Sequence, residues 1–163
     1  MTLIINQSAS ISKFSDIEDS TRGSIITISA NCVIDSFVKI QPAGGSGDFY
    51  LGKNSHINSG CVIYTGNGVN IGNNVLISAN CTLAPGNHEY RDKQVLIRSQ
   101  GFMKSKGGIT IKDDVWIGSN SILLDGTVIE RGCVVAAGSI VRGHLEEFGI
   151  YAGHMATLKG FRR

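Results

Sequence analysis

An aliphatic residue recurs every six positions along the C-terminal part of the chain. The series is Ile111, Ile117, Leu123, Ile129, Val135 and Val141. Six is a multiple of the two-residue strand period, so these side chains all fall on one face of an extended chain, whereas an amphipathic helix repeats every 3.6 residues. Small or β-branched residues stand two positions before the aliphatics, and turn-forming residues such as Gly126, Gly132 and Gly138 lie between repeats. Each repeat therefore predicts one very short strand and one corner. Stacked three to a coil, such repeats predict a triangular parallel β-helix.

The same spacing extends upstream with interruptions. The further sets are Ile28, Ile34 and Ile40; Leu51, Ile57 and Ile63; Ile71, Ile77 and Leu83; and an opening set of Ile5, Ile11 and Ile17. Each set predicts one coil. The largest interruption is the segment 84–108, and a connection of that length within a compact domain is usually functional or disordered. Because this one carries Tyr90, Leu96 and Phe102, we expect a protruding loop that packs against another surface, such as a second subunit. The prediction is thus one all-β solenoid domain, 1–163, with an inserted loop, 84–108, and a short C-terminal tail, 142–163.

Composition narrows the classes of function. The chain is 42% apolar, which argues against disorder, and its formal charge of +2 gives no electrostatic reason to expect nucleic acid as a partner. Its apolar runs are too short to span a bilayer, and no secretion signal is recognisable, so we expect a cytoplasmic location. All four cysteines occupy the small inward slot of a repeat and are predicted to pack in the core rather than to form disulfides or bind zinc; they are Cys32, Cys61, Cys81 and Cys133.

The outward residue just before each repeat aliphatic can be sorted by face of the solenoid. One face then carries the mainly apolar series Val33, His56, Leu76, Trp116 and Val134, while the other two faces are more mixed. A contiguous apolar stripe on a protein surface usually marks an interface. We expect this face to be buried between subunits.

One histidine stands at the base of the long loop. His88 follows Pro85-Gly86 and precedes Glu89-Tyr90. An imidazole can accept a proton from a hydroxyl or amine near neutral pH and return it to a leaving group. From the residues alone, a general base and an ordinary surface histidine are equally plausible interpretations.

The repeat, the loop with its histidine after APG, the stretch DDVWIGSNSILLDGTVIERGCVVAAGSIV and the ending IYAGHMATLKGFRR together resemble the hexapeptide-repeat acyltransferases. Within these, the chain is most similar to sugar O-acetyltransferases and to acetyltransferases of surface-polysaccharide gene clusters, over residues 24–163. The resemblance implies a left-handed parallel β-helix that assembles as a homotrimer with active sites between subunits. It implies transfer of an acetyl group from acetyl-CoA, without a metal, to a sugar hydroxyl during O-antigen or exopolysaccharide biosynthesis.

The resemblance also implies roles for particular residues. His88 matches the catalytic base, and Asn58 matches an asparagine that contacts the acceptor. His56 takes a position where those enzymes often have an aromatic residue, and it is a second candidate for binding the acceptor. The pantetheine arm of acetyl-CoA is expected beside Trp116, Gly118, Ser119, Ala137 and Gly138. Candidates for the CoA phosphates are Arg142, Lys159, Arg162 and Arg163. The tail departs from the family's frequent A-G-N-P-A, since it runs Ala152-Gly153-His154-Met155-Ala156. We expect direct transfer, with a backbone N–H stabilising the oxyanion, because the cysteines point inward and no serine has a recognisable partner.

Three alternatives stay open. The first is an N-acetyltransferase for an amino sugar on a nucleotide carrier, because no residue distinguishes an amine acceptor from a hydroxyl. The second is a metalloenzyme of the γ-carbonic-anhydrase type, which needs three histidines around zinc. That family has two histidines five residues apart, and His56, His88, His144 and His154 include no such pair. The third is a solenoid without catalytic activity.

Overall fold

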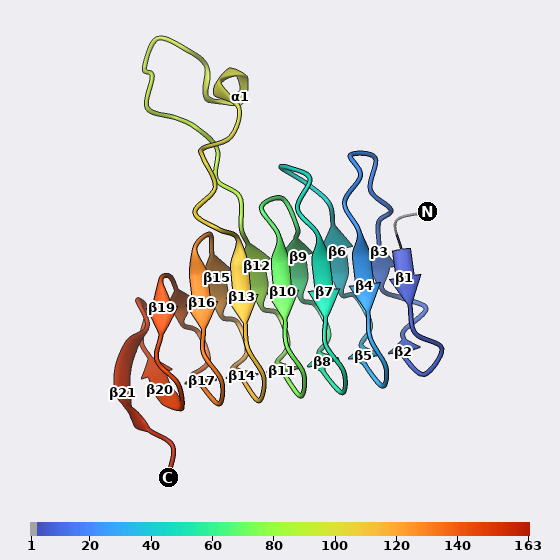
Figure 1. Cartoon of the computed structure of the whole chain (residues 1–163). Coiled ribbons are helices and arrows are strands. Elements are labelled where there is room, and N and C mark those ends of the chain that lie inside the picture. Colours follow the sequence, from blue (N-terminus) through green and yellow to red (C-terminus); the bar gives the residue numbers. More distant parts are fainter. Residues whose placement is uncertain (1–2) are drawn as a thin grey trace.

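The computed structural model describes residues 3–163, which wind into a prism with three parallel sheets as its sides (Figure 1). The first sheet contains β1 (Leu3–Ile5), β4 (Ile26–Ile28), β7 (Phe49–Leu51), β10 (Val69–Ile71), β13 (Ile109–Ile111), β16 (Thr127–Ile129) and β19 (His144–Leu145). The second contains β2 (Ser10–Ile11), β5 (Val33–Ile34), β8 (His56–Ile57), β11 (Leu76–Ile77), β14 (Trp116–Ile117), β17 (Val134–Val135), β20 (Gly149–Ala152) and the antiparallel β21 (Thr157–Phe161). The third contains β3 (Asp16–Ile17), β6 (Lys39–Gln41), β9 (Val62–Tyr64), β12 (Thr82–Ala84), β15 (Ile122–Leu124) and β18 (Ile140–Val141).

The strand register follows the six-residue spacing. Ile5 pairs with Ile28, Ile11 with Ile34 and Ile17 with Ile40, so the expected opening coil is confirmed. The outward residues of the second sheet stack as Val33, His56, Leu76, Trp116 and Val134, the series that the sequence assigned to one face. We call this series the second-sheet face. The insertions therefore leave the register of the coils unchanged, because each insertion leaves at a corner.

The core is a continuous column of inward side chains. The repeat aliphatics from Ile28 to Val141 are almost fully buried, and the four cysteines lie among them with no exposed surface. All four thiols are free, and those of Cys32 and Cys81 donate to backbone carbonyls of a neighbouring coil, at Gly52 and Gly118. The prediction that the cysteines are packing residues is confirmed.

The corners depend on left-handed backbone conformations. Asn31, Asn54 and Asn74 occupy the same corner of successive coils, each with φ of 57°. Their side chains form a ladder, because the amide of each donates to the amide oxygen of the next at 3.2 Å. Gly132 and Gly138 fill the equivalent role, with φ of 72° and 73°. Asparagine and glycine are the residues that adopt this conformation most readily.

The segment predicted as a tail, 142–163, divides into two parts. β19 pairs with β16 and β20 pairs with β17, and Ile140 forms a bridge with Met155, so residues 144–155 make a further coil. The sequence pattern concealed this coil because the step from Val141 to Leu145 is four residues instead of six. Only the last residues leave the solenoid, where β21 folds back antiparallel on β20.

The long insertion projects from the solenoid between β12 and β13 (Figure 1). It contains one short helical turn, α1 (Ile97–Gln100), and its apolar side chains Tyr90, Leu96 and Phe102 are exposed in the single chain. Across residues 3–163, no helix has the length and apolar character needed to cross a membrane.

Candidate functional site

His88 lies in a narrow neck where the two arms of the loop run side by side. The amide N–H of Met103 donates to the Asn87 carbonyl at 2.8 Å, and that of Glu89 donates to the Gly101 carbonyl at 3.0 Å. His88 itself forms an antiparallel bridge with Phe102, and the two rings stack with their centroids 4.6 Å apart. The neck and the stacked ring fix the imidazole, although it lies in an insertion outside the repeat.

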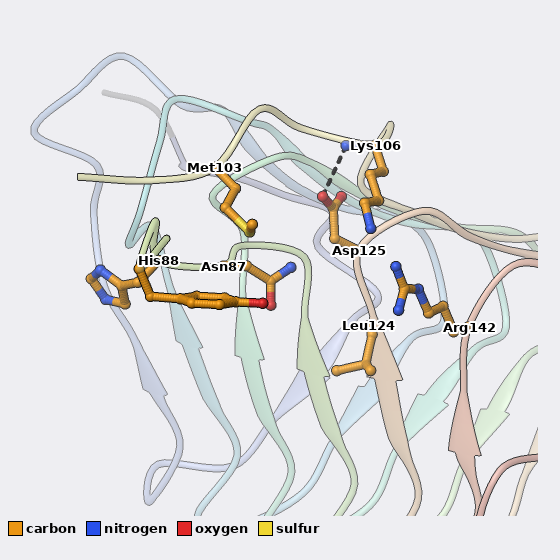
Figure 2. Close-up of a pocket in the computed structure, with 8 residues that line it drawn as sticks. Asn87, His88, Met103, Lys106, Leu124, Asp125 and Arg142 are labelled. Atoms are coloured by element: carbon orange, nitrogen blue, oxygen red, sulfur yellow. Dashed lines mark hydrogen bonds between the residues drawn. The ribbon is translucent and has the colours of Figure 1, made fainter. Parts of the chain in front are cut away.

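The imidazole borders two pockets of about 340 Å³ each. The first is lined by Asn87, His88, Tyr90, Met103, Lys106, Leu124, Asp125 and Arg142. Figure 2 shows His88 at one end of this pocket and the side chains of Lys106 and Arg142 at the other. The second pocket is lined by Ala43, Gly44, Tyr64, Ala84, Gly86, His88 and Phe102. A group placed between two pockets can exchange a proton with molecules bound on either side.

Asp125 is occupied in holding the loop. Asp125 is only 4% exposed. Its carboxylate accepts hydrogen bonds from the backbone N–H groups of Lys106 at 2.8 Å and Gly108 at 2.9 Å (Figure 2). This fixes the returning arm of the loop against the corner between the third and first sheets. Within residues 3–163, the side chains of Lys106 and Arg142 take part in no ion pair. Both cations are therefore available to an anionic group in the pocket.

The acidic neighbour of His88 is paired elsewhere. The Arg91 guanidinium binds the Glu89 carboxylate and lowers the pKa of Glu89 to about 2. Glu89 is consequently charged at neutral pH and engaged with arginine. Neither property suits a proton acceptor that must work near pH 7.

The two residues expected to contact the acceptor do lie together. The His56 Nε2 is 3.0 Å from Asp35 Oδ2, and the Asn58 Nδ2 is 3.2 Å from the same oxygen and 3.1 Å from His56 Nε2. Asp35 was not identified from the sequence. Asp35 occupies the same repeat position as Asn58, one coil earlier. The six-residue spacing aligns these two positions, so a comparison of polar residues in neighbouring coils would have identified Asp35.

The residues expected along the pantetheine arm form a second group. Gly118 and Ser119 lie one coil below Ala137 and Gly138, and the Gly138 N–H donates to the Ser119 carbonyl at 2.8 Å. The coils approach so closely here that a Cβ on Gly118 would lie 2.4 Å from the Ala137 amide nitrogen. Trp116 is outward and 51% exposed, and its indole N–H donates to Ser78 Oγ at 3.0 Å.

The basic candidates are widely separated. Arg142 lines the pocket of His88. Lys159 is exposed on β21. The Arg162 guanidinium donates to Asp114 Oδ2 at 2.9 Å and to the Gly132 carbonyl at 3.0 Å, so it fastens the end of the chain to a corner of the solenoid. Lys106 was missed in the sequence because its relevance depends on the path of the returning loop.

The predicted site is therefore divided within one chain. His88 and Arg142 lie at the corner between the third and first sheets, whereas His56, Asn58 and Trp116 lie on the second sheet. In a three-sided prism that corner is opposite the second sheet. Over the described part of the chain, no group of three potential metal-ligating side chains is gathered.

Comparison with known proteins gives two matching families and several relatives. Residues 108–143 match "Bacterial transferase hexapeptide (six repeats)" and residues 50–85 match "Hexapeptide repeat of succinyl-transferase". The galactoside O-acetyltransferase of Escherichia coli (strain K12) is 35% identical over 65% of this chain and 50% of its own length. In the same organism, the putative lipopolysaccharide biosynthesis O-acetyl transferase WbbJ is 30% identical over 71% of this chain and 62% of its own length. The mitochondrial gamma carbonic anhydrase 2 of Arabidopsis thaliana is 34% identical over 68% of this chain and 42% of its own length.

The chain spans between 32% and 62% of the length of the first curated relatives that it matches. Among solved structures, the S84A mutant of AntD, an N-acyltransferase from Bacillus cereus, was determined in complex with dTDP-4-amino-4,6-dideoxyglucose and coenzyme A. It matches with a TM-score of 0.82 and 23% identity, over 99% of this chain and 84% of that one. With the repeat families and the parallel three-sheet topology, this confirms the predicted left-handed parallel β-helix.

Proposed function

Because the chain belongs to the hexapeptide-repeat acyltransferase superfamily, we propose that it transfers an acetyl group from acetyl-CoA to a hydroxyl of a sugar. We place this reaction in the biosynthesis of a surface polysaccharide, such as O-antigen or exopolysaccharide. The observation that carries the proposal is the position of His88. Its imidazole is fixed in the neck of the loop and borders two pockets, one of which contains the unpaired cations Lys106 and Arg142.

In this reaction His88 acts as the general base. A sugar hydroxyl is a weak nucleophile, so the imidazole removes its proton as the oxygen attacks the thioester carbonyl. The C–O bond forms, the C–S bond breaks, and the proton passes from the imidazolium to the departing thiolate. One positioned proton acceptor of this kind contributes about 10²- to 10⁴-fold in rate. A backbone N–H at a corner of the solenoid would stabilise the oxyanion.

The cations beside His88 suit the phosphates of CoA. Arginine binds phosphate through two parallel hydrogen bonds, and lysine adds a compact positive charge. Arg142 and Lys106 are better placed for this role than Arg162, whose guanidinium already binds Asp114 and Gly132. The pantetheine arm would run beside the close-packed corner of Gly118, Ser119, Ala137 and Gly138, with Trp116 nearby.

A homotrimer would complete the site. His88 and the acceptor residues His56 and Asn58 lie on opposite sides of one chain, so a site that uses both sets needs a second copy. The second-sheet face offers exposed Leu76 and Trp116 to such a copy, and the loop offers exposed Leu96. We propose that the loop corner of one subunit packs against the second-sheet face of the next.

N-acetylation of a nucleotide-linked amino sugar is the second candidate. The observation that favours it is the Asp35 carboxylate beside His56 and Asn58, since a carboxylate would attract an ammonium group. A gamma-carbonic-anhydrase-like activity is the third, because two such enzymes are among the relatives. The three candidates differ in acceptor and in dependence on metal.

The test is a turnover assay of the purified chain with acetyl-CoA against sugars, nucleotide-linked amino sugars and xenobiotics. We expect hydroxyl-bearing sugars to be acetylated, and His88→Ala to reduce kcat by about 10² to 10⁴ without weakening acetyl-CoA binding. His144→Ala is the matched control, because His144 is exposed on β19 and, within residues 3–163, its ring has a hydrogen bond to Glu130 alone. Wild-type turnover by His88→Ala would exclude His88 as the general base. Turnover of amines alone would favour the N-acetyltransferase, and inactivation of the wild type by a chelator would favour the carbonic-anhydrase-like enzyme.

A further inference from the structure

Three polar side chains meet on the second sheet, beside β5 and β8. Asp35 Oδ2, His56 Nε2 and Asn58 Nδ2 form a triangle with sides of 3.0, 3.1 and 3.2 Å. Asp35 and Asn58 occupy one repeat position in successive coils, and His56 lies two residues before Asn58 on the same face. The side chains of His56 and Asp35 are 34% and 36% exposed, so the triangle is partly open to solvent.

The chemistry of the three groups determines where the protons lie. A carboxylate only accepts hydrogen bonds, and the amide nitrogen of asparagine only donates them. An Nε2 lone pair would face the Asp35 carboxylate at 3.0 Å, so Asp35 Oδ2 receives one N–H from Asn58 and one from His56 Nε2. The 3.1 Å contact between Asn58 Nδ2 and His56 Nε2 is then a contact between two donors that share this acceptor, not a hydrogen bond. With the proton on Nε2, the other nitrogen of a neutral imidazole, Nδ1, carries a lone pair. Within residues 3–163, His56 Nδ1 and Asn58 Oδ1 have no hydrogen-bond partner.

We infer that Asp35 is a positioning residue that fixes His56 as the Nε2–H tautomer, so that Nδ1 of His56 and Oδ1 of Asn58 accept hydrogen bonds from two donors of the acceptor sugar. This rests on the proposed function, because it takes the acceptor to be a sugar. The hydroxyls of a sugar ring are donors, and Nδ1 and Oδ1 are the acceptors that these three hydrogen-bonding side chains leave free. Asp35 contacts His56 and acts through it, whereas His56 and Asn58 contact the acceptor.

The same sheet contains a matched pair without this property. The Trp116 indole N–H donates to Ser78 Oγ at 3.0 Å. Ser78 lies two residues after Leu76, the partner of Trp116 in the preceding coil, just as Asp35 lies two residues after Val33, the partner of His56. An indole has one N–H and no second ring nitrogen, so it has no tautomers. Ser78→Ala therefore removes an equivalent bond on the same sheet while leaving the tautomer of His56 untouched.

The first test reads the tautomer directly, without any enzyme assay. The full chain, labelled with ¹⁵N in its histidines, is examined at pH 7 by long-range nitrogen–proton correlation in the ring. We expect Nε2–H at His56 in the wild type and in Ser78→Ala. In Asp35→Asn the new amide can donate to Nε2, so the proton should move to Nδ1, as expected when an orienting carboxylate becomes an amide. Asp35→Ala, which removes the acceptor, should give a mixture of tautomers and serves if Asp35→Asn does not fold. Nδ1–H in the wild type would overturn the inference.

The second test uses the acceptor found in the turnover screen. Asp35→Asn and His56→Ala should each raise the KM for the acceptor by about 10-fold, the effect of one hydrogen bond, while the KM for acetyl-CoA and kcat stay unchanged. The double variant should be no worse than either single variant, because both remove the same interaction. A changed tautomer with an unchanged acceptor KM would overturn the role of His56. If the wild type acetylates nothing, the proposed function fails, and the tautomer measurement still decides the role of Asp35.

Discussion

Replacing Asn54 by alanine should destabilise the solenoid at one corner, whereas replacing it by glycine should have much less effect. Asn54 has φ of 57° and is exposed, so the change removes no buried surface. Its side chain lies in the middle of the corner ladder, where it accepts from Asn31 and donates to Asn74, both at 3.2 Å. Alanine and glycine both remove these bonds. Only alanine adds a Cβ that is unfavourable in the left-handed conformation.

The magnitude follows from these two contributions. Two exposed hydrogen bonds contribute about 0.5 kcal/mol each, at the low end of the usual range. A residue with a Cβ in the left-handed region costs roughly 1 to 2 kcal/mol. We therefore expect Asn54→Gly to cost about 1 kcal/mol and Asn54→Ala about 2 to 3 kcal/mol. For a chain of this size, that is roughly 2 to 4 °C in Tm for each kcal/mol.

Urea denaturation followed by circular dichroism measures both variants. The midpoint should fall further for alanine than for glycine, with no change in the slope of the free energy of unfolding against urea. Asn70 supplies the control, because it is exposed on β10 and does not have positive φ. There the order should reverse, since glycine is less favourable than alanine within a strand. Equal loss for Asn54→Ala and Asn54→Gly would refute the argument that backbone conformation governs this corner.

The remaining predictions concern assembly and the thiols. Leu76→Glu should shift sedimentation towards the monomer, because it places an unpaired charge in the proposed subunit contact. Tyr50→Glu, on the exposed face of the first sheet, should leave sedimentation unchanged. A stable wild-type monomer at micromolar concentration would contradict the proposed assembly. All four thiols are fully buried, and burial also raises the pKa of Cys32 and Cys133. An aromatic disulfide reagent at pH 8 should therefore titrate cysteine only after unfolding, and rapid labelling of the folded chain would contradict the burial of the thiols. The stability should also depend on pH: the free energy of unfolding should fall as the pH rises above about 8.5, where the unfolded chain loses the Cys32 and Cys133 thiol protons that the folded chain retains.

Most of the fold follows from one period in the sequence. The six-residue spacing correctly predicted the three sheets, the opening coil and the alignment of His56, Leu76 and Trp116, because most inward side chains are small or aliphatic, Phe49 being an exception. The last coil was missed where a corner shortened to four residues. Some corner conformations were also hidden. Phe37 and Phe148 adopt φ of 63° and 58°, which the stacking of coils imposes on residues that do not prefer it.

The candidate site was less accessible to sequence reasoning. His88 stood out because an insertion interrupts the repeat beside it. Its ring stack on Phe102, and the proximity of Lys106 and Arg142, depend on the path of a loop with no periodicity. Asp35 looked like an ordinary outward residue, and its role emerged only with the diagonal contact to His56 in the next coil.

We expect His88 of one subunit to act together with the acceptor residues of the next, and complementation between two inactive variants tests this arrangement. The two variants are His88→Ala and Asn58→Arg, and the second would block the acceptor face. They are produced together with different tags, and mixed assemblies are isolated and assayed for acetyl transfer. In a mixed cyclic trimer of either composition, about one interface in three combines an intact His88 with an intact Asn58, so we expect roughly a third of wild-type activity from two inactive variants. Mixed assemblies of wild type with His88→Ala, prepared in the same way, control for the effect of co-assembly. If those are active and the mixture of the two variants is not, the site does not form between subunits in this way.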